Sequence, residues 1–311
     1  MTELKDTVHL NTDILVAGGG AAGMAAAKAA SEQGATVILV EKSPVLGGIL
    51  NRCTHPGFGL GYYDEEITGQ EYAERYREEL GSEDLTVLPD TTVIAVNEDR
   101  TALLVSEGRI TEVSFRVLIA ASGSYEVPIE SVAPEGTRPA GIMTAGCAQG
   151  LINENHLEIG SRIIVLGSGN VGQIMAGQLA DAGKEIIAII EKNDAPGGLS
   201  RNVREYIKGR NLPLILNSTI TKIHGTNRIT GVTVKNLLTG EESILSCDTL
   251  ITALGLIPDR ALLDNICTDG TYPDWVILTG NCDRIYDFAD AVTASGEQAG
   301  LTASLKCRSN K

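Results

Sequence analysis

The sequence of 311 residues lacks closely spaced cysteines. Its six cysteines lie at positions 53, 147, 247, 267, 282 and 307, and no C-x-x-C or C-x-x-x-x-C occurs. This spacing excludes the usual zinc sites, ferredoxin-type clusters and vicinal dithiols. Scattered free thiols are typical of proteins in a reducing, intracellular compartment.

Basic residues are also scarce, with 25 Lys and Arg against 40 Asp and Glu, for a formal net charge of −15. Nucleic acids and anionic membranes repel such a surface, so we expect neither as a partner. No basic segment precedes an apolar stretch at the N-terminus, and the most apolar helix, around Lys28, is too short to cross a bilayer. We therefore expect a cytoplasmic protein with no signal peptide and no membrane span.

Aromatic residues make up only 4% of the chain, whereas glycine is abundant at 35 residues. The first glycine cluster follows a short apolar run at 14–17, which is typical of a buried parallel strand. Gly18, Gly20 and Gly23 form G-x-G-x-x-G, an alanine-rich helical run follows, and a second strand ends in Glu41. A strand, a glycine turn, a helix and a second strand with a terminal acid together predict a dinucleotide site.

Each part of this motif has a physical task. Gly18 permits the tight turn, Gly20 lets the backbone approach a pyrophosphate, and Gly23 lets helix and strand pack closely. The N-terminus of the helix offers unpaired N–H groups to the phosphates. Glu41 can accept hydrogen bonds from both hydroxyls of an adenosine ribose.

The same unit occurs a second time in the chain. Gly167, Gly169 and Gly172 repeat the glycine spacing, and the following strand ends in Glu191. The likeness extends beyond the acid, because EKSPVLGG at 41–48 matches EKNDAPGG at 191–198 in the first two and the last two residues. Such self-similarity indicates a duplicated unit. Two dinucleotide sites in one chain suggest two redox cofactors, one tightly held and the other exchangeable.

With these motifs the chain resembles the two-dinucleotide flavoproteins of the pyridine nucleotide–disulfide oxidoreductase superfamily, over nearly its whole length. VLIAASGSYEVP at 117–128 and TLITALGLIPD at 249–259 are similar to the segments where such chains leave and re-enter the FAD domain. The segment at 276–300 resembles the strand, turn and helix that close over the flavin. The length matches the short, thioredoxin-reductase-like type.

The resemblance implies an α/β fold with two Rossmann-like, three-layer dinucleotide-binding domains, the second inserted into the first. The FAD domain would be discontinuous, at 1–124 and 250–311, and the NAD(P) domain would span 125–249. The residues expected at the flavin are Gly18, Gly20, Ala21, Ala22, Gly23, Glu41, Lys42, Gly48, Ile49, Val93, Ala121, Ser122, Gly123, Gly280, Asn281 and Asp283. Those expected at the nicotinamide dinucleotide are Gly167, Ser168, Gly169, Asn170, Val171, Gly172, Glu191 and Gly255.

One of these positions departs from the family pattern. The family usually has Gly-Asp before the last helix, with the aspartate on the ribityl chain of the flavin. Here Asn281 follows Gly280, and Asp283 comes two residues later. The ribityl contact would therefore fall to an amide that can still hydrogen-bond a hydroxyl.

The stretch GGILNRCTHPGFG at 47–59 holds a single cysteine, Cys53. In the glutathione-reductase type, the redox cysteines occupy the second and seventh positions after the glycine pair, which here are Leu50 and His55. A dithiol relay is therefore not expected, and Cys53 and His55 are only weak catalytic candidates. Cys53 is either a packing residue or a single redox thiol, as in flavoprotein peroxidases or coenzyme A-disulfide reductases, with Arg52 and His55 beside it.

The predicted function is an FAD-dependent NAD(P)H oxidoreductase that passes electrons between nicotinamide and flavin. The cofactors carry that chemistry, so the lack of an obvious catalytic set of side chains is expected. Glu191 favours NAD over NADP, because a carboxylate pairs with the 2′-hydroxyl and repels a 2′-phosphate. The alternatives are a stand-alone Cys53 disulfide reductase or peroxidase, and a protein whose inserted domain holds a structural nucleotide such as ATP.

A narrower resemblance rests on GGILNRC…GFG, PAGIMTAGCAQ and YDFADAVTASGEQAG. These stretches are similar to FAD subunits of amino-acid and proline dehydrogenases and of hydrogen cyanide synthase. They are also similar to the oxidoreductase associated with a glycerol-3-phosphate dehydrogenase-like flavoprotein. This resemblance implies a protein partner for electron transfer, and a homo- or hetero-oligomer.

Overall fold

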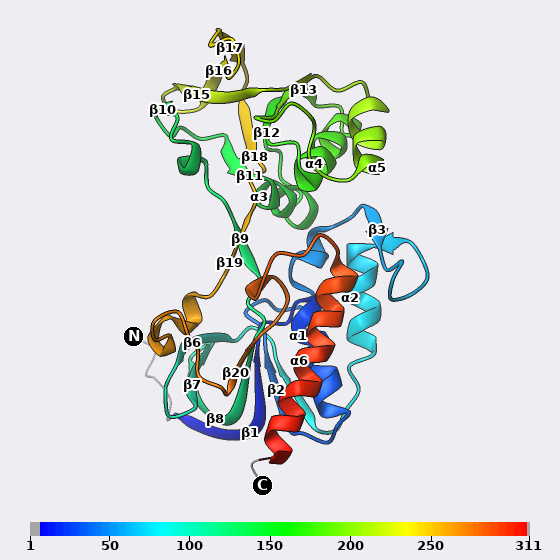
Figure 1. Cartoon of the computed structure of the whole chain (residues 1–311), viewed down its shortest axis with the longest axis vertical. Helices are drawn as coiled ribbons and strands as arrows, with labels where there is room; N and C mark the ends of the chain where they lie inside the picture. Colours follow the sequence, from blue (N-terminus) through cyan, green and yellow to red (C-terminus); the bar gives the residue numbers. More distant parts are fainter. Residues whose placement is uncertain (1–6, 310–311) are drawn as a thin grey trace. The chain divides into compact units, whose positions relative to one another are not determined.

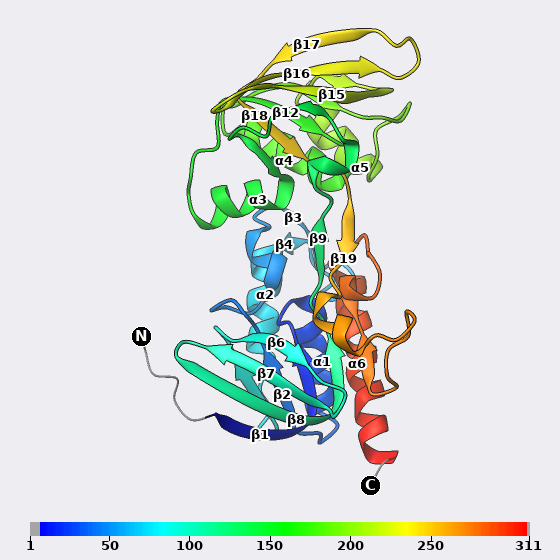
Figure 2. The same ribbon diagram turned by 90° about the vertical axis from the view of Figure 1, so that its left-hand side faces the viewer.

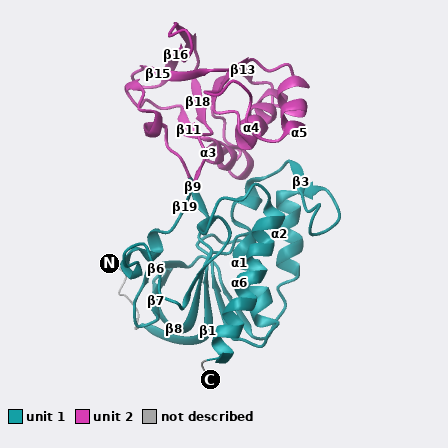
Figure 3. Cartoon of the chain, viewed as in Figure 1, with its two compact units in different colours: residues 1–125, 257–311 teal, residues 126–256 magenta. Residues whose placement is uncertain are grey.

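The computed structural model describes residues 7–309 and confirms the predicted α/β class. The chain divides into two compact units, one formed by Met1–Tyr125 with Ile257–Lys311 and the other by Glu126–Leu256 (Figure 3). Each unit is built around its own set of parallel strands. Within the described part of the chain, we find no helix with the length and apolar character needed to cross a membrane.

The first unit is organised around a seven-stranded sheet that includes the order β5-β2-β1-β8-β7-β6, with β20 also paired to β8 (Figure 1). The strands β1, β2, β5, β8 and β20 are parallel, whereas β6 and β7 form an antiparallel hairpin next to β8. The all-apolar β2 is fully buried, as expected for a central parallel strand. The bounds are β1 Val8–Ala17, β2 Val37–Val40, β5 Leu85–Leu88, β6 Thr92–Val96, β7 Thr101–Ser106, β8 Arg109–Ala120 and β20 Val276–Leu278.

Helices α1 (Ala21–Ser31), α2 (Gly69–Glu78) and α6 (Ala289–Ser309) lie on one side of this sheet (Figures 1 and 2). Two glycines allow α6 to touch α1. A Cβ on Gly296 would lie 2.2 Å from the carbonyl oxygen of Ala22, and one on Gly300 would lie 2.3 Å from that of Ala26. Shorter elements complete the unit: η1 Gly48–Arg52, β3 Pro56–Phe58, β4 Ile67–Thr68, η5 Ala261–Ile266 and η6 Gly280–Cys282.

The second unit has a parallel five-stranded sheet in the order β11-β18-β12-β13-β14 and a four-stranded sheet in the order β10-β15-β16-β17. The parallel strands are β11 Ile142–Thr144, β12 Arg162–Leu166, β13 Glu185–Ile190, β14 Leu214–Ile215 and β18 Thr249–Thr252. The other sheet contains β10 Glu135–Gly136, β15 Ser218–Gly225, β16 Ile229–Asn236 and β17 Glu242–Ser246. The helical segments are η2 Ile129–Val132, α3 Ala145–Gln149, η3 Gly150–Glu154, α4 Asn170–Asp181, α5 Ser200–Asn202 and η4 Val203–Lys208.

Two short strands, β9 (Ser124–Glu126) and β19 (Leu256–Pro258), connect the units and pair with each other. The N–H of Val127 donates to the carbonyl oxygen of Gly255, and the N–H of Asp259 donates to that of Gly123, each at 3.0 Å. The sequence placed the return to the first domain at residue 250. In the structure β18 still belongs to the second unit, because it pairs with both β11 and β12.

Candidate dinucleotide sites

The turn between β1 and α1 requires glycine at two positions. Gly18 has φ of +109°, and a Cβ there would lie 2.4 Å from the carbonyl oxygen of Ala121. A Cβ on Gly23 would lie 1.7 Å from the carbonyl oxygen of Gly18. The turn therefore packs backbone against backbone, and α1 begins at Ala21 directly behind it. A helix N-terminus behind an open glycine turn is suited to binding phosphate.

The carboxylate of Glu41 is held beside this turn. It is buried, and it accepts hydrogen bonds from the backbone N–H groups of Gly19 at 2.7 Å and Ser43 at 2.8 Å. A carboxylate offers about four acceptor sites, so these two bonds leave about two of them for a ligand. A ribose diol supplies two hydroxyl donors, which fits that number. Lys42, the next residue, is exposed.

Distant segments come together at the same turn. The N–H of Gly47 donates to the carbonyl oxygen of Gly19 at 2.8 Å, and a Cβ on Gly48 would lie 3.2 Å from the Cα of Gly20. Ile49 follows with 56% of its surface exposed. From the other end of the chain, a Cβ on Gly280 would lie 2.7 Å from the Cβ of Ala22. The structure thus gathers residues that the sequence assigned to one site from stretches more than 200 residues apart.

The turn at Gly280 is fixed by contacts that the sequence did not reveal. Arg260 donates from Nε to the carbonyl oxygen of Cys282 at 2.9 Å, and also donates to the carbonyl oxygen of Asp283. Ser122 donates to the carbonyl oxygen of Asp259 at 2.6 Å. The Oδ1 atom of Asn281 accepts from the N–H of Tyr286 at 3.1 Å.

Val93 was also assigned to the flavin from the sequence. The structure places it in β6, paired with Leu104 of β7. Its side chain packs against the core that contains Leu15, Leu104 and Trp275. These contacts do not link the side chain to the glycine turn, so the assignment of Val93 to the flavin stays a prediction.

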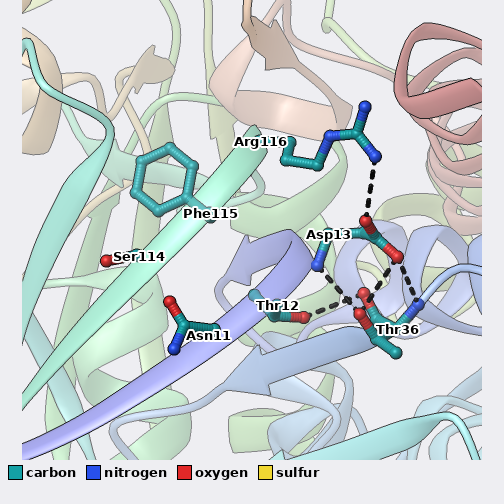
Figure 4. Close-up of a pocket in the computed structure, with 7 residues that line it drawn as sticks. All are labelled: Asn11, Thr12, Asp13, Thr36, Ser114, Phe115 and Arg116. Atoms are coloured by element: carbon teal, nitrogen blue, oxygen red, sulfur yellow. Dashed lines mark hydrogen bonds and ion pairs between the residues drawn. The ribbon is translucent and has the colours of Figure 1, made fainter. Parts of the chain in front are cut away.

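A separate pocket of about 370 Å³ lies along β1 and β8 (Figure 4). Asp13 pairs with Arg116 at 3.3 Å, and its Oδ2 accepts from the N–H of Thr36 at 3.2 Å. Burial raises the pKa of Asp13, but the bonds from Thr36 and Arg116 outweigh it and leave the pKa below its usual value. These polar groups satisfy one another. The lining residues are Asn11, Thr12, Asp13, Thr36, Ser114, Phe115 and Arg116.

The second glycine turn repeats the geometry of the first. Gly167 has φ of +104°, and a Cβ there would lie 2.2 Å from the carbonyl oxygen of Ala253. A Cβ on Gly172 would lie 2.2 Å from the carbonyl oxygen of Gly167. A Cβ on Gly169 would meet nothing within 4 Å, so this residue leaves space in front of α4. Val171, in the first turn of α4, is 39% exposed.

Glu191 lies at the end of β13 as Glu41 lies at the end of β2, but it has more partners. Its Oε2 accepts from the backbone N–H of Ser168 at 3.0 Å and from the hydroxyl of Ser168 at 2.6 Å. Its Oε1 accepts from the backbone N–H of Asn193 at 3.0 Å and from Nδ2 of Asn193 at 2.7 Å. Burial raises the pKa of Glu191, but these bonds and the nearby Lys192 outweigh it, so the pKa is lowered and the group is ionised at neutral pH.

The loop after Glu191 is tied to the glycine turn by side chains. Gln173 donates from Nε2 to the carbonyl oxygens of Ser168 and Gly197, both at 2.6 Å. Asn170 accepts at Oδ1 from the N–H of Leu199 at 2.7 Å. The sequence singled out Asn170 but neither Gln173 nor Asn193. Comparing the two copies position by position could have drawn attention to both residues. Gln173 stands where the first copy has Met24, and Asn193 stands where it has Ser43.

Cys53 is buried, with 8% of its surface exposed. Its thiol donates to the carbonyl oxygen of Ile49 at 3.4 Å, and a Cβ on Gly69 would lie 2.5 Å from its Cβ. Burial raises the pKa of Cys53 to about 12, although Arg52 acts in the opposite direction. The Nδ1 atom of His55 lies 2.9 Å from the carbonyl oxygen of Pro56. These contacts favour the packing interpretation of Cys53 over a reactive thiolate.

Two copies of a glycine turn, each with a buried glutamate at the end of the next strand, define a protein built to bind two dinucleotides. The chain belongs to the pyridine nucleotide-disulphide oxidoreductase family, whose model matches residues 12–272. Members of this family are FAD-dependent oxidoreductases that use NAD(P)H, and this chain is an enzyme of that class. No group of His, Cys, Asp and Glu side chains suited to hold a metal ion occurs within residues 7–309.

Three individual proteins illustrate the relationship. The chain is 30% identical to the alpha subunit of sarcosine oxidase from Corynebacterium sp. (strain P-1), over 96% of this chain and 33% of that protein. It is 28% identical to an opine oxidase subunit of Agrobacterium tumefaciens (strain Ach5), over 63% of this chain and 40% of that protein. The chain thus spans less than half of the length of either relative.

The third likeness is to the crystal structure of the thioredoxin reductase of T. acidophilum. The TM-score is 0.72, with 23% identity over 96% of this chain and 98% of that one. At this level of identity the likeness shows the fold. It agrees with the predicted two-domain arrangement of the short type.

Proposed function

We propose that the first unit holds FAD and that the second unit binds NAD(H) as the exchangeable partner. The observation that carries this proposal is the difference between two otherwise matching sites. Glu41 receives two hydrogen bonds, both from backbone, whereas Glu191 receives four. The residues around Glu41 fit a tightly held cofactor, because a buried carboxylate there retains open acceptor sites beside a turn where only glycine fits.

Each group of residues has a defined task in this proposal. Gly18, Gly20 and the start of α1 would receive the pyrophosphate of FAD, and Glu41 would receive its adenosine ribose. The Gly280–Cys282 turn, held by Arg260, would place Asn281 against the ribityl chain. When bound, the nicotinamide and flavin rings exchange a hydride, and the protein aligns and insulates them. The remaining residues assigned from the sequence would line the same two sites.

We further propose that NADH is preferred over NADPH. Glu191 is buried and ionised, so a 2′-phosphate placed beside it would meet a negative charge with little solvent screening. Under anaerobic conditions, NADH should bleach the flavin band of the purified protein at concentrations roughly tenfold below those of NADPH, about 1.4 kcal/mol. Absorbance titration with both coenzymes measures this directly.

The matched variant for this test is Glu191→Ala, which should reduce the preference by weakening NADH and relieving the repulsion of NADPH. Equal titration curves for the two coenzymes with the unaltered protein would contradict the preference. If neither coenzyme bleaches the flavin, the second unit holds a nucleotide for a structural reason, as in the ATP alternative.

We also propose that the chain acts together with a protein partner that supplies or accepts the electrons. Two of its relatives are named as subunits of oxidases, one of sarcosine oxidase and one of opine oxidase. With a net charge of −15, the chain would favour a partner with a basic contact surface. Without that partner, the chain should pass electrons from NADH to an artificial dye but show negligible activity with disulfide substrates.

The variant Cys53→Ser separates this proposal from the stand-alone thiol reductase. Because the thiol is buried and its pKa is raised to about 12, we expect turnover of NADH with a dye to stay within about twofold of wild type. Steady-state rates and flavin content of the purified variant are the measurements. Cys147→Ser is the control, since Cys147 is exposed. A peroxide or disulfide activity that disappears in Cys53→Ser, with flavin retained, would instead support the single-cysteine alternative.

A further inference from the structure

We infer that the side chains of Ser168 and Asn193 occupy the acceptor positions on Glu191 that the adenosine ribose takes when the nucleotide binds. Binding in the second unit would therefore begin by displacing an internal substitute for the ribose diol. This inference rests on the proposed assignment of the second unit to a nicotinamide dinucleotide. According to this inference, the side chains of Ser168 and Asn193 lower the affinity for the nucleotide and so keep it exchangeable.

The duplicated sequence shows which bonds are shared and which are added. Aligning the two copies on their glycines and acids places Ser168 over Gly19 and Asn193 over Ser43. In both copies the carboxylate accepts from these two backbone N–H groups, at 2.7 to 3.0 Å. Only Glu191 accepts two further bonds, from the Ser168 hydroxyl at 2.6 Å and from Asn193 Nδ2 at 2.7 Å.

Counting acceptor sites shows why the added bonds matter. The two oxygens of a carboxylate accept about four hydrogen bonds in all, and Glu191 already has two at each oxygen. A ribose diol can bond to Glu191 only if donors leave. The backbone N–H groups are fixed by the turn, so the two side-chain donors are the ones that would have to leave. A ribose that binds at Glu191 would therefore replace existing hydrogen bonds. A ribose that binds at Glu41 would form hydrogen bonds at acceptor sites that are still open.

The first unit also has little room for a counterpart of the Ser168 hydroxyl. A Cβ on Gly19 would lie 2.5 Å from Cδ2 of Leu46 and 2.9 Å from Cβ of Glu41. A serine at Gly19 would therefore require Leu46 and Glu41 to shift, whereas its counterpart Ser168 is accommodated with no exposed surface. The Ser168 hydroxyl also accepts from the N–H of Gly197 at 2.9 Å, so its displacement would break one of the bonds that hold that loop.

The test converts each added donor into the residue of the first copy, with Ser168→Gly and Asn193→Ser. Both variants keep the backbone N–H donors, and Asn193 is exposed, so at least this variant should fold as wild type. Binding of ADP to the flavin-loaded protein is measured by calorimetry, with 2′,3′-dideoxy-ADP as the matched probe that lacks both hydroxyls. ADP carries the relevant ribose and has no redox activity.

Each variant should bind ADP about three- to tenfold more tightly than wild type, with no gain for the dideoxy probe. If ADP binds equally or more weakly in both variants, then Ser168 and Asn193 orient the carboxylate rather than compete for it, and the inference is overturned. If the wild-type protein still binds NADH in that case, the proposed function stands although the inference fails. If wild type and variants bind neither ADP nor NADH, the assignment of the second unit fails, and the inference fails with it.

Discussion

Gly23→Ala is expected to yield a protein that purifies without flavin. The added Cβ would lie 1.7 Å from the carbonyl oxygen of Gly18, which is backbone in the turn itself. No side-chain rotation can relieve that contact, so α1 must move away from β1 and the phosphate-binding end of the helix moves with it. Overpacking at a buried contact costs about 1–3 kcal/mol or more. Visible absorbance and flavin content measure the loss.

The matched control is Gly20→Ala in the same turn. A Cβ on Gly20 would meet nothing within 4 Å, and the backbone there is extended with φ of −75°. The flavin-free form of this variant should unfold at the wild-type temperature, whereas its affinity for FAD should fall because the methyl group enters the space for the pyrophosphate. A Gly23→Ala protein that carries a full complement of FAD would contradict the assignment of the first turn.

The features that could be predicted from the sequence are those fixed by local geometry. A turn with backbone against backbone demands glycine at Gly18 and Gly23, and a strand buried on both faces demands an apolar run such as that of β2. The spacing from the first glycine to the strand-end acid follows from the lengths of one helix and one strand. Because both copies meet these requirements, the duplicated fold and the candidate residues Glu41 and Glu191 could be predicted from the sequence.

Features that depend on contacts between distant segments could not be predicted. Arg52 and His55 flank Cys53 in the sequence and suggest an activated thiol. The structure instead buries the thiol, because the backbone at Gly69, at the start of α2, packs against Cys53. This burial raises the pKa of the thiol. Likewise, Arg260 directly follows the stretch at 249–259, but the sequence does not reveal that it holds the Gly280–Cys282 turn. These contacts require the tertiary fold.

The placement of β18 illustrates the same limit for the domain boundary. Its sequence, TLIT, reads as a buried strand in either domain. Only the pairing of β18 with β11 and β12 assigns it to the second unit. The boundary therefore depends on hydrogen bonds to strands more than 80 residues earlier in the chain.

Gly172→Ala should weaken the binding of NADH and leave the binding of flavin intact. The added Cβ would lie 2.2 Å from the carbonyl oxygen of Gly167 and 3.1 Å from Cβ of Ala253, all within the second unit. The first unit has its own hydrophobic cores, so flavin binding should survive. We expect a yellow protein that dithionite still reduces, but whose apparent affinity for NADH falls by roughly 10- to 100-fold, about 1.4–2.7 kcal/mol.

The control for this experiment is Gly183→Ala at the far end of α4, where φ is +78° and a Cβ would meet nothing within 4 Å. This variant should lose about 1 kcal/mol of stability from backbone strain while keeping its affinity for NADH. Anaerobic titration of the flavin band and calorimetry with NADH distinguish the two variants. Full reduction of Gly172→Ala by NADH at wild-type concentrations would mean that the second glycine turn does not hold the nicotinamide dinucleotide. Loss of flavin from Gly172→Ala would show instead that the two units do not bind their cofactors independently.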